Sequence, residues 1–251
     1  MSRGRVGMAA VVLALAAGCG GSHEFVVHRP AAEPATGTSD LVLRVVWLSD
    51  RQLPAGSRAG TPPLLSLYGD GRLIVSTLDQ TAPGASWPQL SEYRVDAAAI
   101  PRLRAVAVAA AGASTRGDQD GSMLAVTVAG TGGRRTSTVP ATGTAGQRLL
   151  TALRPTGAYV PYRAAAAAVV ATPTTDSGGQ QRNWPLSTLE GEPLAGTAAG
   201  AWCTLLRGAV LAQARQAATG ATAATLWRSD RRLWTVWFRP LLPDEPGCAA
   251  L

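Results

Sequence analysis

The chain has 251 residues, which is enough for one large domain or two small ones whose core needs no metal or dense disulfides. All 23 basic residues are arginine, and the lack of lysine excludes Schiff-base and serine–lysine chemistry. The arginines are scattered, with only Arg134-Arg135 and Arg231-Arg232 adjacent, so we expect solvated turn charges, or alternatively a phosphate or envelope-polymer patch, and no nucleic-acid partner.

The N-terminus has the pattern of a bacterial lipoprotein signal peptide. Arg3 and Arg5 form a positive region, and the apolar stretch 6–17 is too short to span a bilayer. The order Ala16-Ala17-Gly18-Cys19 resembles the lipobox, in which a peptidase cuts before a cysteine that has received a diacylglycerol. We therefore expect removal of residues 1–18, which leaves a net charge of +5, and an anchor of fatty acyl chains such as palmitate on Cys19. Ordinary secretory cleavage near Ala17, or an uncleaved anchor, is the alternative.

Residues 19–39 are rich in Gly, Ser, Thr, Pro and Ala, and we interpret them as a flexible tether. A coil of this length spans on the order of 25 Å, so the folded part is expected to stay close to the extracytoplasmic side of the cell membrane. With Cys19 acylated, Cys203 and Cys248 remain, and we expect them to form a disulfide. Two free buried thiols are the alternative. A metal site is not expected, because no histidine lies near either cysteine.

The first half of the mature chain shows strand and hairpin patterns. Residues 41–49 indicate a buried strand. The clearest signal is Gly69-Asp70-Gly71 between the runs 64–68 and 72–77, which predicts a hairpin with Leu65, Leu67, Leu73 and Val75 on one face. Further elements are expected at 92–95 (strand), 97–111 (helix capped by Asp96), 123–128 and 135–139 (hairpin), and 145–153 (helix).

The second half begins with an expected strand at 159–172 and a polar linker at 173–185. A run of residues at helical spacing then predicts a helix that begins near Trp202, has Cys203 in its first turn and ends before Gly220. These residues are Trp202, Leu205, Leu206, Ala209, Val210 and Gln213. Two strands, 223–228 and 232–239, close the chain. The second has large apolar residues on both faces, which predicts a central strand covered on both sides.

Together these patterns predict an α+β fold in which antiparallel β-hairpins pack with a few helices. We expect a signal peptide (1–18), a lipidated cysteine and tether (19–39), and two small units (40–157 and 158–251), the second with the disulfide.

Two stretches are similar to a group of uncharacterised lipoproteins and secreted proteins of actinobacteria. One is the Tyr-Gly-Asp-Gly hairpin at 66–74, and the other is Arg-Pro-Leu-Leu-Pro-Asp-Glu-Pro-Gly-Cys at 239–248. The resemblance implies an exported two-part α+β protein. It implies no catalytic residue.

The composition narrows the chemistry that is available. Both histidines, His23 and His28, lie in the expected tether, so we expect no histidine-dependent triad or zinc site in the folded part. Asp118 and Asp120 resemble a fragment of a calcium loop but lack the later glutamate, which favours a solvated turn. Glu190 and Glu192 flank Gly191 in an expected loop and are the candidates for acid/base chemistry on a glycan.

Five tryptophans gather in the C-terminal half: Trp184, Trp202, Trp227, Trp234 and Trp237. They could line a groove for a sugar chain, a peptide or a lipid, although core packing explains them equally well. The leading hypothesis is a non-enzymatic, membrane-anchored module that binds an envelope protein or a cell-wall polymer and needs no cofactor. A carboxylate-dependent glycan enzyme and a carrier for a small hydrophobic ligand are the alternatives.

Overall fold

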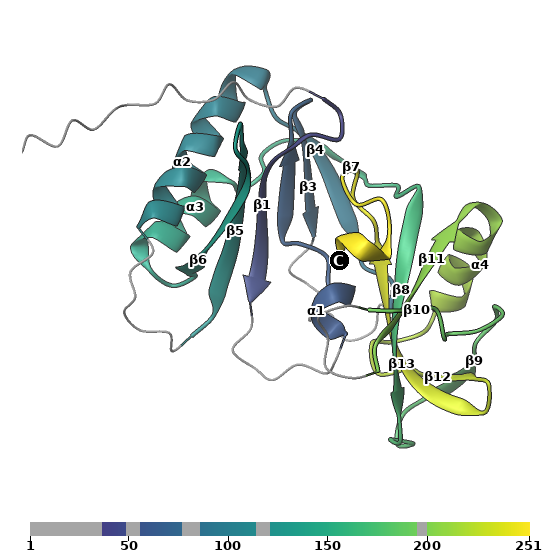
Figure 1. The fold of residues 1–251 in the computed structure, drawn as a ribbon. Helices are drawn as coiled ribbons and strands as arrows, with labels where there is room; N and C mark the ends of the chain where they lie inside the picture. Colours follow the sequence, from purple (N-terminus) through teal and green to yellow (C-terminus); the bar gives the residue numbers. More distant parts are fainter. Residues whose placement is uncertain (1–36, 49–55, 77–85, 114–120, 195–199) are drawn as a thin grey trace, which may run out of the picture. The chain divides into compact units, whose positions relative to one another are not determined.

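A computed structural model describes residues 37–48, 56–76, 86–113, 121–194 and 200–251. They belong to one compact unit, Ala32–Leu251, and form two antiparallel-rich sheets with helices packed on them, so the predicted α+β class is confirmed (Figure 1). Cys19, the expected signal peptide and most of the expected tether lie outside the described residues. No helix in the described ranges is both long and apolar enough to cross a bilayer.

The first sheet has seven strands in the order β6-β5-β1-β2-β3-β4-β7. Its strands are β1 (Leu41–Leu48), β2 (Leu65–Tyr68), β3 (Arg72–Ser76), β4 (Leu90–Arg94), β5 (Met123–Gly130), β6 (Gly133–Pro140) and β7 (Tyr159–Pro161). Helices α2 (Ile100–Gly112) and α3 (Thr144–Ala152) pack together on one face of this sheet. The core between helices and sheet is aliphatic and includes Leu43, Val45, Leu67, Leu124 and Leu149.

Local predictions in this part hold closely. Leu65 pairs with Val75 and Leu67 with Leu73, as the hairpin pattern requires. Gly71 has φ +85°, a conformation that glycine reaches without steric cost, which explains the Asp-Gly turn. Asp96 caps the short 3₁₀ turn η2 (Ala97–Ala99) by accepting from the Ala98 amide at 2.9 Å. In α2 the buried residues are Ile100, Leu103, Ala107 and Ala110, at the helical spacing read from the sequence.

The second sheet has six strands in the order β10-β11-β8-β13-β12-β9. They are β8 (Ala166–Thr174), β9 (Gln181–Asn183), β10 (Glu192–Pro193), β11 (Trp202–Arg207), β12 (Leu226–Ser229) and β13 (Arg232–Pro240). β13 lies between β8 and β12, and clusters of buried residues pack on both its faces, which confirms the expected central position. Helix α4 (Gly208–Ala218) covers one face (Figure 1).

The prediction of a helix that begins at Trp202 is wrong for the first half of that helix. Residues Trp202–Arg207 form β11, which pairs along its whole length with β8. Gly208 then adopts φ +55°, and only after it does the chain become helical, with Leu211, Ala214 and Ala218 buried. Pairing with a neighbouring strand determines the conformation of this short run, because its apolar residues suit either a strand or a helix.

The prediction of one strand at 159–172 is also wrong, because two strands in different sheets occupy this range. β7 pairs with β4 in the first sheet, and β8 pairs with β11 and β13 in the second. The change of sheet therefore lies between residues 161 and 166, a few residues after the boundary expected at 157. Within the expected polar linker, Gln181–Asn183 forms the short strand β9, parallel to β12.

Segments from each half of the chain pack on the other half's sheet. Trp87, which precedes β4, stacks on Phe238 of β13 at 5.4 Å between ring centroids. The one-turn helix α1 (Ser57–Gly60) lies against β8 and β13, and a side chain on Gly60 would overlap Trp237. In the C-terminal segment, defined here as residues 241–251, Leu241 packs in a cluster with the second sheet and Leu242 in a cluster with the first.

Candidate functional site

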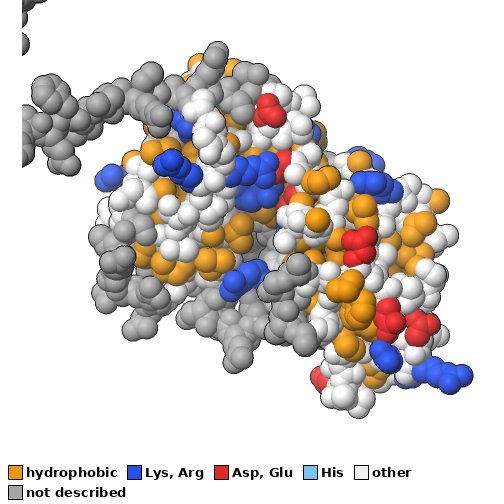
Figure 2. Space-filling view, viewed as in Figure 1, with side chains coloured by type: hydrophobic (Ala, Val, Ile, Leu, Met, Phe, Trp, Pro, Cys, Tyr) orange, Lys and Arg blue, Asp and Glu red, His pale blue; other side chains and the backbone are white. Residues whose placement is uncertain are grey.

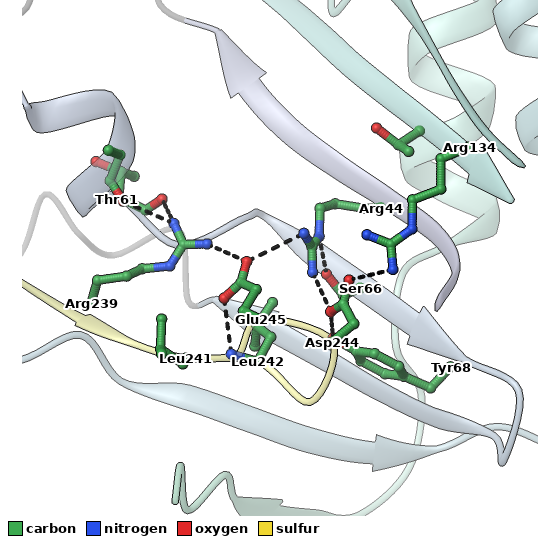
Figure 3. A network of polar contacts seen from close by, with 12 residues as sticks. Arg44, Thr61, Ser66, Tyr68, Arg134, Arg239, Leu241, Leu242, Asp244 and Glu245 are labelled. Carbon is green, nitrogen blue, oxygen red and sulfur yellow. Dashed lines mark hydrogen bonds and ion pairs between the residues drawn. The ribbon is translucent and has the colours of Figure 1, made fainter. Parts of the chain in front are cut away.

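A buried network of charged side chains joins the C-terminal segment to the first sheet (Figure 3). It consists of Asp244 and Glu245 from that segment, Arg239 at the end of β13, and Arg44 and Tyr68 on β1 and β2. Arg134 of β6 reaches it from the solvent side, with 51% of its side chain exposed. The carboxylates of Asp244 and Glu245 are only 3% and 1% exposed.

Asp244 is the centre of one half of the network. Its Oδ1 accepts hydrogen bonds from Arg44 at 2.7 Å and from the Tyr68 hydroxyl at 2.8 Å. Its Oδ2 forms an ion pair with Arg134 at 3.0 Å. Arg44 is itself oriented by a hydrogen bond from its Nε to the Ser66 Oγ, 3.0 Å away. The charge of this carboxylate is thus compensated by two guanidinium groups.

Glu245 is the centre of the other half. Its Oε1 accepts from Arg239 at 2.6 Å and pairs with Arg44 at 3.2 Å, while its Oε2 accepts from the Leu242 amide at 2.9 Å. Arg239 also donates to the carbonyl oxygens of Ala59 and Thr61, next to α1. Burial lowers the pKa of Arg239, and the nearby Glu245 carboxylate opposes that effect. Glu245 therefore stabilises the charge of a guanidinium that is buried away from water.

The network brings together the two stretches quoted above for the resemblance. Tyr68 belongs to the Tyr-Gly-Asp-Gly hairpin, and Asp244 and Glu245 belong to the proline-rich run before Cys248. Sequence reasoning assigned no role to this acid pair. A signal was available, since two adjacent acids lie within an otherwise apolar run that follows a buried strand, and buried acids need cationic partners.

The disulfide between Cys203 and Cys248 is present, as predicted. It joins β11 to the short turn η3 (Cys248–Ala250) at the end of the chain, and both cysteines are buried. The C-terminal segment is therefore held covalently to the second sheet and by ion pairs to the first. This arrangement identifies the network as a connection between sheets, with its carboxylates engaged as ion-pair partners.

Tyr162 contacts the C-terminal segment close to the network. Its hydroxyl donates to the Leu241 carbonyl at 2.9 Å, and burial raises its pKa to about 12 from an ordinary value of 10.0. Burial raises the pKa of Tyr68 as well, with the Asp244 charge adding to the effect.

We predict that the free energy of unfolding declines as pH rises from 10 toward 12. In that window the unfolded chain loses the Tyr162 proton while the folded chain keeps it, so deprotonation favours unfolding; below pH 10 both states are protonated and nothing is lost. Urea titrations at several pH values should show a shallower decline for Tyr162→Phe than for the wild type. An unchanged slope would contradict the assignment.

The structure places three of the candidate tryptophans in the core. Trp184, Trp227 and Trp234 are 7%, 1% and 0% exposed, and Trp184 meets Trp227 edge-on at 5.4 Å. They pack with Phe238 and Val236 under α4. Trp202 and Trp237 are partly exposed and pack in different clusters, one with α4 and one with the disulfide. The five side chains therefore do not share one surface.

Of the candidate carboxylates, the structure describes Glu190 and Glu192, which have different surroundings. Glu190 makes an ion pair with Arg232 at 2.7 Å, with 42% of its side chain exposed. Glu192 is exposed in β10, where its backbone pairs with Cys203. Asp118 and Asp120 lie outside the described residues. In the described ranges, no three His, Cys, Asp or Glu side chains gather where a metal ion could bind.

Comparisons of the chain with protein-family models, curated proteins and solved structures found no match. The resemblance to actinobacterial exported proteins stays a prediction.

Proposed function

We propose that this protein is an exported lipoprotein, anchored in the cell membrane through Cys19, whose folded part is a non-enzymatic binding module of the cell envelope. The observation that carries the proposal is the order of the first residues. A positive start, a short apolar stretch and Ala-Ala-Gly directly before Cys19 meet the needs of export, cleavage and thiol acylation. More than one acyl chain on the cysteine gives stable membrane anchoring.

The cysteine pairing supports this proposal. The chain has three cysteines, and Cys203 and Cys248 are bonded to each other. Disulfides of this structural kind persist mainly in oxidising compartments outside the cytoplasm. The remaining cysteine is the one that the signal pattern singles out for acylation.

The use of the acidic side chains supports a binding role over catalysis. Asp244 and Glu245 are each held by two arginines, and Asp70 and Glu190 have ion pairs with Arg72 and Arg232. A general acid or base must reach a substrate to exchange a proton with it, and these carboxylates are instead in contact with arginine side chains of the fold. The tryptophans of the second sheet serve mainly as core, which favours a surface contact over an internal ligand cavity.

Metabolic labelling with an alkyne fatty acid tests the anchor. Wild-type protein expressed in a bacterium that processes lipoproteins is expected to take up the label, and Cys19→Ala is expected to lose it entirely. The double variant Cys203→Ala, Cys248→Ala is the matched control, since it removes the other two thiols and should keep the label. Label on Cys19→Ala, or an unlabelled wild type, would refute the anchor.

A further inference from the structure

The positive charge of the mature chain is concentrated in one part of the fold. Residues 97–157 contain seven arginines and two aspartates, a net charge of +5. Residues 19–251 as a whole also have a net charge of +5, so the remainder of the mature chain is neutral. The two aspartates, Asp118 and Asp120, lie outside the described residues, and the described part of 97–157 has no acidic residue.

This segment builds the helical side of the first sheet. It comprises α2, α3 and the outer strands β5 and β6, and the two helices pack on each other and on β6. Arg102 of α2 and Arg148 and Arg154, in and after α3, are exposed. In the left part of Figure 2, over these helices, blue side chains lie among orange and white ones.

The exposed arginines of this surface differ from those of the network. Arg134 pairs with Asp244 and Arg104 donates to the Ala129 carbonyl, so both have partners in the fold. Among the residues that the structure describes, no carboxylate forms an ion pair with Arg102, Arg148 or Arg154. Exposed arginine side chains of this kind can contact an external anion.

The surface is not purely polar. Val108 on the outer side of α2 is 48% exposed. An exposed aliphatic side chain on a helix that also presents arginine suits the boundary between lipid headgroups and acyl chains.

The chain enters the fold near the start of this surface. The first described residues, Gly37 to Asp40, form a turn, and the Asp40 carbonyl accepts from Gly69 at 2.9 Å. Two residues on, the Gly71 carbonyl accepts from Val95 at 2.9 Å, and η2 begins at Ala97 and runs into α2 at Ile100. The tether thus joins the fold beside the N-terminal end of α2.

We propose that this basic face, defined by Arg102, Arg148 and Arg154 with Val108, docks onto the surface of an anionic phospholipid bilayer. The inference rests on the proposed anchoring of Cys19, because seventeen residues separate that cysteine from Gly37, and a coil of this length has a root-mean-square span of about 25 Å. Because anchoring gives the folded part a high local concentration at the bilayer, weak contacts between its arginines and the lipid headgroups are enough for docking. Docking then fixes which side of the protein faces outward to its envelope partner.

Vesicle co-sedimentation tests this surface without the anchor. The protein is residues 19–251 with Cys19→Ala, which retains every described contact. It is mixed with vesicles of phosphatidylcholine or of equal parts phosphatidylcholine and phosphatidylglycerol. We expect binding only to the second, and its loss as salt rises from about 0.1 M to about 1 M, which shortens the Debye length from about 10 Å to about 3 Å.

A charge-matched pair of variants locates the surface. Arg102→Gln, Arg148→Gln, Arg154→Gln is expected to weaken binding at least about tenfold, since each arginine at an anionic surface contributes about fivefold. The control, Arg58→Gln, Arg163→Gln, Arg231→Gln, removes the same charge from exposed positions outside 97–157 and should bind within about twofold of the parent.

The remaining outcomes overturn the proposal. Equal binding to both kinds of vesicle, or equal weakening in both triple variants, would show that this face has no special role. Binding to soluble poly(glycerol phosphate) but not to vesicles would assign the face to a wall polymer. Because the protein in this assay carries no acyl chain, failure to bind vesicles says nothing about Cys19, and failure of the labelling experiment leaves the vesicle result intact.

Discussion

Glu245→Gln is expected to lower the free energy of unfolding by about 3–5 kcal/mol, because it leaves two arginines without their shared counter-charge in the interior. The Glu245 side chain is 1% exposed, and its Oε1 lies 2.6 Å from Arg239 and 3.2 Å from Arg44. Burial already lowers the pKa of Arg239, and Glu245 is the main group that opposes this effect. Urea unfolding followed by tryptophan fluorescence measures the change.

The matched control is Glu190→Gln. Glu190 makes the same kind of ion pair with Arg232, at 2.7 Å compared with 2.6 Å for Glu245 and Arg239, but its two side chains are 42% and 63% exposed. An exposed pair is worth about 0–1 kcal/mol, so the two substitutions should differ several-fold. Arg239→Met combined with Glu245→Gln should cost less than the sum of the single changes. Similar small losses for Glu245 and Glu190 would contradict the account of the network.

Removal of the disulfide by Cys203→Ala, Cys248→Ala is expected to cost about 4 kcal/mol. The bond closes a loop with a sequence separation of 45, and the chain-entropy estimate for a loop of that length has this size. It also releases the end of the segment whose Asp244 and Glu245 bind Arg44. The free energy of unfolding from urea titration is the measurement.

Reduction provides the control for that experiment. Dithiothreitol should lower the stability of the wild type by a comparable amount and leave the double alanine variant unchanged. A loss below about 1 kcal/mol on both routes would mean that the ion pairs alone hold the C-terminal segment.

Helices, strands and turns could be predicted where interactions between residues close in sequence determine them. The Gly-Asp-Gly turn allows one backbone geometry, and the pairing of Leu65 with Val75 follows from it. The buried stripe of α2 could be predicted because its apolar residues recur every three or four positions, a spacing that fits a helix and not a strand. β11 could not be predicted in this way, since its six residues suit the spacing of a helix as well as that of a strand. Pairing with Ala166–Ala171 decides between the two.

The candidate site depends on contacts that no local pattern contains. Arg44 and Asp244 are 200 residues apart in sequence and 2.7 Å apart in space. Composition shows that acids such as Asp244 need partners, but with 23 arginines in the chain it does not say which ones. The disulfide could be predicted because the choice was small, with three cysteines and one of them in the signal pattern.

The most direct test of the proposed anchor is mass spectrometry of the N-terminal peptide of protein purified from native membranes. The account predicts that the mature chain begins at residue 19 and that its cysteine carries a diacylglyceryl thioether. An unmodified Cys19, or a mature chain that begins at another residue, would contradict it.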